Sequence, residues 1–262
     1  MTATTGPQSH GRRTGRRAVS SKTSRDEPPG PLIWTLPEPP GRPTASLSRA
    51  AILAAALAVA DAEGAAALTM RRVATDLGSS TPMSLYRYVG SKDGLVDLML
   101  DAVYGEIEVP GEPGPDWRAD LESLAQRTWA AIQRHLWFGE LVHTRPPFGP
   151  NALRYFDFRF AVLERLGLGA AAMSRITAAI DGHLIGSALQ IAEENRMRQR
   201  TGLATDEQLR AAAQPFLEPV LAGGRYPAFT RWMRDHRAAV PAGNVEYALA
   251  CLLDGIAARL PS

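Results

Sequence analysis

LTMRRVATDLGSSTPMSLYRYVGSKDGL, residues 68–95, contains the start signals of three successive helices and the stop signals of the first two. The first is short, residues 70–77, and has Thr69 as its N-cap. The second, residues 82–89, has proline in its first turn, and Ser91 caps a longer third helix. Two short helices joined by a glycine-containing turn are typical of a helix-turn-helix, whose second helix enters the major groove of DNA. The same spacing also occurs in an ordinary hairpin of a helical bundle, so the spacing alone leaves both interpretations open.

Helical periodicity continues on both sides of this stretch. Ser48 is a suitable N-cap for a preceding helix, whose apolar residues recur every three or four positions and which ends near Gly64. After a Pro- and Gly-rich break at 109–115, amphipathic segments are predicted at 116–136, 149–167, 170–199, 205–221 and 242–260. No stretch alternates as a strand does. The sequence therefore predicts an all-α fold: a three-helix DNA-binding domain at 47–93 and a larger helical domain at 94–262.

The composition limits the class of protein. An apolar fraction of 45% is typical of a globular chain. The single cysteine, Cys251, excludes an internal disulfide and fits a reducing compartment. There is no apolar run of about 18 residues, as a membrane helix needs, and no apolar segment follows the basic N-terminus, as in a secretory signal. We expect a cytoplasmic protein that does not enter the membrane.

The N-terminal segment is basic. Residues 1–49 contain eight Lys or Arg against three acidic residues, whereas the whole chain has a net charge of only +2. Residues 1–46 are rich in Gly, Pro, Ser and Thr, and we expect a largely disordered arm, except that the apolar run 31–34 is expected to dock on the body. The arm is either a solvated tail or a DNA-binding element, since Gly41-Arg42-Pro43 has the look of a minor-groove AT-hook core.

The second short helix carries several hydrogen-bonding side chains. Its residues include Ser84, Tyr86, Arg87 and Tyr88, while Met83, Leu85 and Val89 are expected to hold the helix on the body. At the start of the preceding helix, Thr69 and Arg71 would face the same groove. Lys92 lies at a helix N-terminus, where backbone amides favour a phosphate.

Residues 47–99 resemble the N-terminal domain of the tetracycline-repressor (TetR) family. The resemblance rests on a set of motifs at 60–64 (ADAEG), 68–74 (LTMRRVA), 77–78 (LG), 85–89 (LYRYV) and 91–95 (SKDGL). It implies that Arg71, Ser84, Tyr86, Arg87, Tyr88 and Lys92 lie at DNA-facing positions. One departure is that six residues, 79–84, separate Gly78 from Leu85, where most members have five.

The rest of the chain resembles the C-terminal domain of the tetracycline repressors themselves. The likeness rests on 116–118 (DWR), 144–147 (TRPP), 149–153 (GPNAL) and 252–256 (LLDGI). It implies a ligand chamber and a dimer interface of two helices per subunit, here residues 170–199 and 242–260. The residues expected at that interface are Ala178, Ala179, Gly182, Ile185, Gly186, Leu189, Leu249, Leu252, Leu253 and Ile256. The alternative is that these helices form only the core of the subunit.

Aromatic and polar residues are concentrated between 129 and 160, as in a small-molecule pocket. The candidate ligand-binding residues are Trp129, Phe138, His143, Arg145, Phe148, Asn151, Tyr155, Phe158 and His183. The same pattern also fits a core with satisfied polar edges. At the positions where tetracycline repressors bind magnesium and drug, this chain has Leu141 and approximately Gln190, and neither replaces such ligands. The effector is therefore not expected to be a magnesium–tetracycline complex.

No other chemistry stands out. The five histidines have no metal-binding spacing, and there is no phosphate-binding GxxxxGK and no GxSxG nucleophile motif. No metal, cofactor or catalytic residue is therefore expected, although a helical enzyme remains the rival of another class. The sequence predicts a homodimeric, sequence-specific transcriptional regulator whose binding to operator DNA responds to a small-molecule effector. The family resemblance implies a repressor that the effector releases, and nothing in the sequence itself distinguishes a repressor from an activator. The alternative is an architectural DNA-binding protein that needs no ligand.

Overall fold

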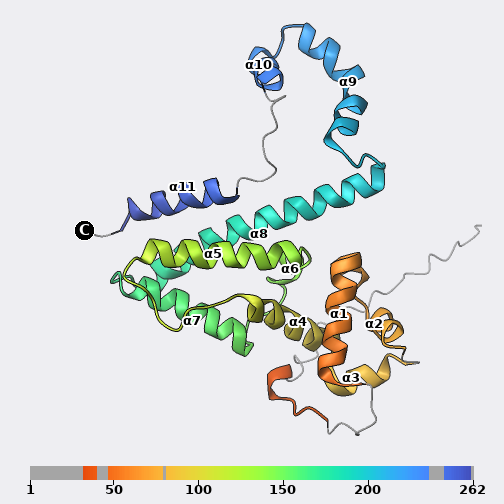
Figure 1. Cartoon of the computed structure of the whole chain (residues 1–262), viewed down its shortest axis with the longest axis vertical. Helices are drawn as coiled ribbons and strands as arrows, with labels where there is room; N and C mark the ends of the chain where they lie inside the picture. Colours follow the sequence, from red (N-terminus) through yellow and green to blue (C-terminus); the bar gives the residue numbers. More distant parts are fainter. Residues whose placement is uncertain (1–31, 40–46, 79–80, 236–244, 261–262) are drawn as a thin grey trace, which may run out of the picture. The chain divides into compact units, whose positions relative to one another are not determined.

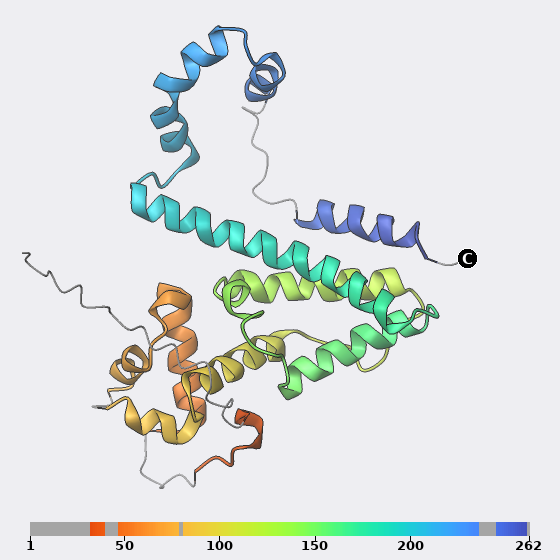
Figure 2. The same cartoon turned by 180° about the vertical axis from the view of Figure 1, so that it is seen from behind.

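The computed structural model describes residues 32–39, 47–78, 81–235 and 245–260. Within these ranges the chain forms helices and no strand, which confirms the all-α fold (Figures 1 and 2). The α-helices are α1 (Arg49–Glu63), α2 (Met70–Asp76), α3 (Met83–Val89), α4 (Lys92–Glu106), α5 (Trp117–Arg134), α6 (Phe138–Leu141), α7 (Pro150–Glu164), α8 (Ala170–Thr201), α9 (Asp206–Ala222), α10 (Pro227–Asp235) and α11 (Val245–Ala257). Two short 3-10 helices are η1 (Ile33–Thr35) and η2 (Ala65–Ala67).

The predicted helix starts are confirmed by their caps. Ser48, Thr69 and Ser91 each accept a hydrogen bond from the backbone amide three residues further on, at 3.1, 3.1 and 2.9 Å. Each bond satisfies one of the amides that a helix N-terminus leaves without an internal partner. The long C-terminal helices also begin within three residues of their predicted starts, whereas the short helices α6 and α10 are not predicted from the sequence.

Helix α1 organises the N-terminal part of the body. It contacts α2, α3 and α4 (Figure 1). Its buried Ile52 and Ala56 belong to the same core as Val73 of α2 and Leu85 of α3, all at most 2% exposed. Helix α3 is therefore held in place by its packing on α1 and α4.

The apolar segment before α1 docks on this support, as predicted. Ile33 is 1% exposed, and its 3-10 helix contacts α4. Arg49 fastens the segment, because its Nη2 donates to the carbonyl oxygen of Leu36 at 3.1 Å and its Nε donates to that of Tyr88 at 3.1 Å. Residues 1–31 and 40–46 of the basic arm, including Gly41-Arg42-Pro43, lie outside the described residues.

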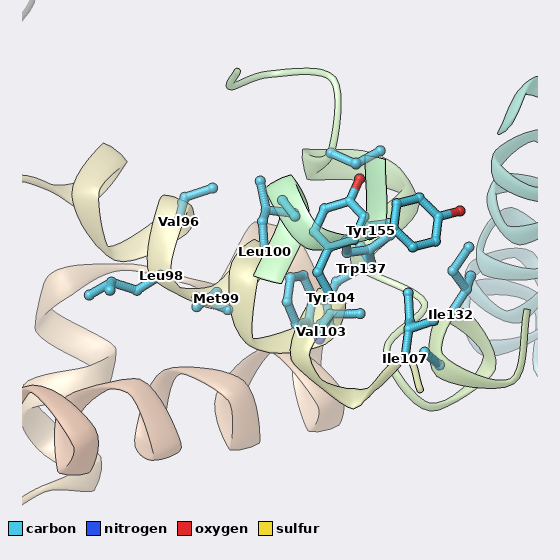
Figure 3. Close-up of a cluster of buried hydrophobic side chains, with 14 of the residues drawn as sticks. Val96, Leu98, Met99, Leu100, Val103, Tyr104, Ile107, Ile132, Trp137 and Tyr155 are labelled. Carbon is cyan, nitrogen blue, oxygen red and sulfur yellow. The ribbon is translucent and has the colours of Figure 1, made fainter. Parts of the chain in front are cut away.

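Helix α4 connects the DNA-binding helices with the rest of the body. Residues 94–101 are all buried. Helix α4 contacts α1 and α3 of the DNA-binding part and also α5, α6 and α7 of the larger part. Figure 3 shows side chains of α4, among them Met99, Val103 and Tyr104, gathered with side chains of α5 and α7. One hydrophobic core therefore extends from η1 to α11.

The long helix α8 packs against α5, α6, α7 and α11. Beyond it, α9 buries none of its residues, and the aromatic side chains of Phe216, Phe229 and Trp232 on α9 and α10 are exposed.

Among the described residues, no helix combines the length and the apolar character needed to cross a membrane.

Helix α7 is docked through its N-terminus onto α4. Asp101 of α4 is 6% exposed, and its Oδ1 accepts from the backbone amides of Asn151 and Ala152 at 3.0 and 2.9 Å. A Cβ on the adjacent Gly149 would lie 2.1 Å from that same oxygen. Only glycine therefore allows the carboxylate to approach the helix end.

Gly149→Ala is expected to destabilise the protein by about 1–3 kcal/mol, the usual cost of overpacking a well-packed site. The added methyl group must displace the Asp101 carboxylate and break its two amide hydrogen bonds. Urea denaturation measures the loss. The matched control is Gly111→Ala in the exposed loop between α4 and α5, where a Cβ would meet nothing within 4 Å and the backbone does not have a positive φ. Equal destabilisation by both substitutions would contradict the argument.

Candidate DNA-reading helix and ligand chamber

Helix α3 turns one face to the core. Leu85 and Val89 are completely buried, and Tyr88, between them on the same face, is 9% exposed. The spacing of three and four residues places all three side chains on one side of a helix. The expectation that Tyr88 faces DNA is therefore not supported, because this tyrosine belongs to the core that holds α3 in place.

The other face of α3 is open. Arg87 is exposed, Tyr86 is half-buried against the core, and Ser84 Oγ donates to the carbonyl oxygen of Thr81 at 2.7 Å. Met83 is 76% exposed, so the sequence-based expectation that it anchors the helix is wrong. It lies in the first turn of α3, whose apolar anchor is Leu85. Sequence reasoning missed it as a surface residue because its apolar character favoured the core.

Three cations surround this helix. Arg71 is the second residue of α2, Arg87 lies in the last turn of α3, and Lys92 is the first residue of α4, and all three are exposed. None of them takes part in an ion pair among the described residues. Arg72 differs, because its guanidinium lies 2.7 Å from Glu63 and 3.5 Å from Asp76. Thr69 serves as the N-cap of α2 and remains exposed.

A cavity of about 360 Å³ lies among α4, α5, α6, α7, α8 and the loop that follows α6. We call it the chamber. Four of the candidate ligand-binding residues line it: Phe138, His143, Arg145 and Tyr155. Its volume falls within the range typical of small-molecule sites.

Two other aromatic candidates line smaller cavities, and one lies in the core. Trp129 lines a separate cavity of about 180 Å³ between α5 and α11. Phe148 is 52% exposed, whereas Phe158 is 5% exposed and belongs to the core. These residues come from α5, from the loop before α7 and from α7, so the way the helices pack decides which of them reach a cavity.

Two polar candidates have structural partners instead. The amide of Asn151 donates to the backbone oxygen of Asp101 at 3.2 Å and to its carboxylate at 3.0 Å. The Nε2 of His183 lies 2.9 Å from the carbonyl oxygen of Val245, at the start of α11. Neither residue lines the chamber, because these bonds hold α7 on α4 and α8 on α11.

Arg145 connects the chamber to α4. Its Nε and Nη2 donate to the two carboxylate oxygens of Asp97 at 2.9 and 3.0 Å, and its Nη1 donates to Asp93 at 3.1 Å. The hydrogen bond to Asp97 is the main reason why the pKa of Arg145 is raised. A chamber-lining residue is thus held by the first two turns of the helix that follows α3.

Arg159 forms a buried ion pair behind the chamber. It is 1% exposed, and its Nη1 donates to the Asp181 carboxylate at 2.9 Å and to the Tyr155 hydroxyl at 3.3 Å. Its Nη2 donates to the carbonyl oxygen of Thr177 at 3.2 Å. The pair fastens α7 to α8, the helices that form two walls of the chamber.

Tyr104 of α4 is a chamber residue that sequence reasoning missed. It is 6% exposed and lies beside Tyr155 in Figure 3, with 5.2 Å between the ring centroids. Its centroid lies 5.4 Å from that of Phe138. Burial raises the pKa of its hydroxyl. Its position four residues after the apolar Leu100 was the available signal, since it places an amphipathic aromatic residue on the buried face of the helix.

The comparisons with known proteins agree with this arrangement. Residues 52–99 match the family model "Bacterial regulatory proteins, tetR family", and residues 109–260 match "Tetracyclin repressor-like, C-terminal domain". The chain is 40% identical to the HTH-type transcriptional repressor DrrR1 of Streptomyces coeruleorubidus over 208 residues, 78% of this chain and 76% of that protein. This chain belongs to the TetR family of transcriptional regulators.

Other relatives of this TetR-family regulator support the same conclusion. An HTH-type transcriptional regulator of Saccharopolyspora erythraea is 36% identical over 80% of this chain and 88% of its own. Among solved structures, ActR of Streptomyces coelicolor in complex with (S)-DNPA has a TM-score of 0.63 and 25% identity, and covers 82% of this chain and 99% of its own. ActR in complex with actinorhodin has a TM-score of 0.66 and 24% identity, and covers 83% of this chain and all of its own.

A second connection in this TetR-family regulator joins α1 and α4 to the turn between α5 and α6. His135 has its Nδ1 2.7 Å from Asp61 Oδ1 of α1 and its Nε2 3.0 Å from Glu106 Oε1 of α4. The indole of Trp137 donates to the same oxygen of Asp61 at 2.6 Å. We call these four residues the histidine clamp.

Glu106→Gln is expected to destabilise the regulator by about 1 kcal/mol at neutral pH, a small value because the carboxylate is 36% exposed. Burial raises its pKa, but hydrogen bonds from Arg134 and His135 outweigh burial and lower it below 4.5. An acid whose pKa is lower in the folded state stabilises that state above the unfolded-state pKa.

The difference between wild type and Glu106→Gln should therefore shrink as the pH falls below about 4.5 and through the folded-state pKa. Urea denaturation over a descending pH series measures it. Glu108→Gln is the control, because the Glu108 side chain is 85% exposed. A Glu106 difference that stays constant with pH would show that the lost interaction is not ionic.

Proposed function

We propose that this regulator is a homodimeric repressor whose α3 helices read two half-sites of an operator, and that a small molecule in the chamber releases it. The observation that supports this most directly is the set of exposed cations, Arg71, Arg87 and Lys92, around a helix fixed by its buried face. Exposed cations on and beside a short helix, without ion-pair partners among the described residues, are suited to phosphates and base edges.

Each exposed residue has a proposed role at the DNA. Arg87 donates to a guanine edge in the major groove, and Met83 contacts a thymine methyl group. Arg71 and Lys92 bind phosphates, the latter together with the N-terminal amides of α4. The hydroxyl groups of Thr69, Ser84 and Tyr86 supply further polar contacts. Tyr88 has no role at the DNA in this proposal.

We propose that α8 and α11 form the dimer interface. Ala178, Ala179, Gly182 and Gly186 are exposed on α8, and a Cβ on either glycine would meet no atom within 4 Å, which leaves room for a close partner helix. Leu189 is 36% exposed. Three residues predicted at the interface, Ile185, Leu249 and Leu253, are instead buried within the subunit, because α8 and α11 pack on each other.

The proposed release acts through α4. A ligand that displaces the loop around Arg145 would disturb its bonds to Asp97 and Asp93, next to the phosphate-binding Lys92. A ligand shifts such an equilibrium only by its different affinities for the two arrangements. The solved complexes of ActR with small molecules support the use of a chamber of this kind.

The effector is not expected to be a magnesium–tetracycline complex. Leu141 is half-buried against the core and offers no donor atom, and the Gln190 amide is exposed on α8. Calorimetry with tetracycline, with and without magnesium, tests this expectation, and magnesium-dependent binding would contradict it.

The proposal includes no catalysed reaction and places the regulator in the cytoplasm.

The proposal is tested by pulling down genomic DNA fragments with the purified full-length regulator and footprinting any enriched fragment. We expect a discrete protected site with two-fold symmetry, since one short helix makes too few contacts alone. Uniform, salt-sensitive binding without a footprint would favour an architectural role instead. Absence of DNA binding would contradict both.

A further inference from the structure

The charged groups that line the chamber are paired within the protein. Asp181 is neutralised by the buried Arg159, and Arg145 by Asp97 and Asp93. His143 lines the chamber but is exposed to solvent, so it lies where the chamber opens. A charged ligand would therefore meet no unmatched counter-charge in the interior, and its desolvation would have no compensation.

The polar groups of the interior are also satisfied, with one exception. Thr128 Oγ1 donates to the carbonyl oxygen of Leu124 at 2.8 Å and lies 3.2 Å from the Tyr155 hydroxyl, which Arg159 also reaches. Thr144 Oγ1 donates to the carbonyl oxygen of Leu141 at 2.6 Å. The hydroxyl of Tyr104 has no hydrogen-bond partner among the described residues, although the side chain is only 6% exposed.

We propose that the chamber binds an uncharged aromatic molecule through a carbonyl oxygen that accepts a hydrogen bond from the Tyr104 hydroxyl. This inference rests on the proposed function, because it assigns a chemical class to the effector of that site. The Tyr104 hydroxyl would then make the polar contact with the ligand, and so select among aromatic molecules those that carry a carbonyl group.

The aromatic part of the ligand is inferred from the rings beside Tyr104. Its centroid lies 5.4 Å from Phe138, 5.2 Å from Tyr155 and 5.8 Å from Phe156, and all four residues line the chamber. Their planes are tilted by 50–77° to that of Tyr104, so a flat ligand meets both ring edges and ring faces.

The carbonyl is inferred from the state of the hydroxyl. Burial raises the pKa of Tyr104, so the hydroxyl keeps its proton at neutral pH and can donate it. The hydroxyl opens on the chamber and has no hydrogen-bond partner among the described residues, so an acceptor on the ligand can take its hydrogen bond. A protonated amine would instead bring a charge that Asp181, already paired with Arg159, is not free to neutralise.

The experiment uses two probes of the same ring skeleton, fluorenone, which has a carbonyl group, and fluorene, which lacks it. Equilibrium dialysis with the full-length protein gives the affinity for each. We expect wild type to bind fluorenone about 3- to 10-fold more tightly, the ratio that one net hydrogen bond provides. Tyr104→Phe should abolish this preference by weakening fluorenone binding while leaving fluorene binding unchanged.

Tyr86→Phe is the matched control, because Tyr86 lies on α3 and does not line the chamber. It should keep the wild-type preference. Equal affinity of wild type for the two probes, no binding of either, or a preference that survives in Tyr104→Phe would each overturn the inference. These ligand-binding results are independent of the operator footprint. If the proposed regulator function is wrong, the footprint itself is absent.

Discussion

Arg87→Ala is expected to weaken operator binding by about 100-fold or more, because both subunits of a dimer lose a base contact worth about 1–3 kcal/mol each. The arginine is exposed in the last turn of α3 and has no ion-pair partner among the described residues. The free protein should be unaffected, since no described bond is broken. Fluorescence anisotropy on the footprinted operator at a fixed salt concentration measures the effect.

Arg72→Ala is the matched control for this experiment. Arg72 is also a cation of the helix-turn-helix, but its guanidinium is bound to Glu63 and Asp76. Its removal should change operator affinity much less than removal of Arg87. A comparable loss in the two variants would indicate that only the net charge of the domain matters and that α3 does not read the base edges.

Asp181→Ala is expected to destabilise the protein by about 3–5 kcal/mol, because it leaves the Arg159 charge buried without its partner. The Arg159 side chain is 2% exposed, whereas that of Asp181 is 27% exposed, so the uncompensated charge is the arginine. For a chain of this size the melting temperature should fall by roughly 10 °C. Thermal and urea denaturation measure both quantities.

Two further variants separate the buried charge from the loss of a side chain. The double variant Arg159→Met with Asp181→Ala removes both charges and should recover most of the stability. Asp76→Ala breaks an ion pair in which both partners are more than one-third exposed, and it should cost less than about 1 kcal/mol. A double variant as unstable as Asp181→Ala alone would show that the charge of Arg159 is not the cause.

The helices of this regulator could be predicted from the sequence because their signals are local. Ser48, Thr69 and Ser91 make the capping bonds that their residue types and positions indicate. The three-residue and four-residue spacing in α3 also contains the information that Tyr88 lies beside Leu85 and Val89. The family motif instead implies a DNA-facing position for Tyr88, and the two indications differ at this residue.

The chamber could be predicted only in part, because its lining depends on how several helices pack. Arg145 and Tyr155 line it, but the polar groups of Asn151 and His183 are used to join helices. The sequence does not indicate which polar side chains find a partner within the protein. Tyr104 was missed for the same reason, since its importance follows from the absence of a hydrogen-bond partner among the described residues.

The continuous burial of residues 94–101 has a consequence for protein engineering. A hybrid regulator that combines this DNA-binding part with the sensor of a relative has no exposed position between residues 94 and 101 at which to join the two. If α4 stays with the DNA-binding part, the transplanted sensor must supply partners for Asp97 of α4 and Asp61 of α1, which here are Arg145 and His135. The junction of a hybrid protein should therefore be chosen so that these side-chain pairs stay together, and a turn between two helices does not by itself mark a suitable junction.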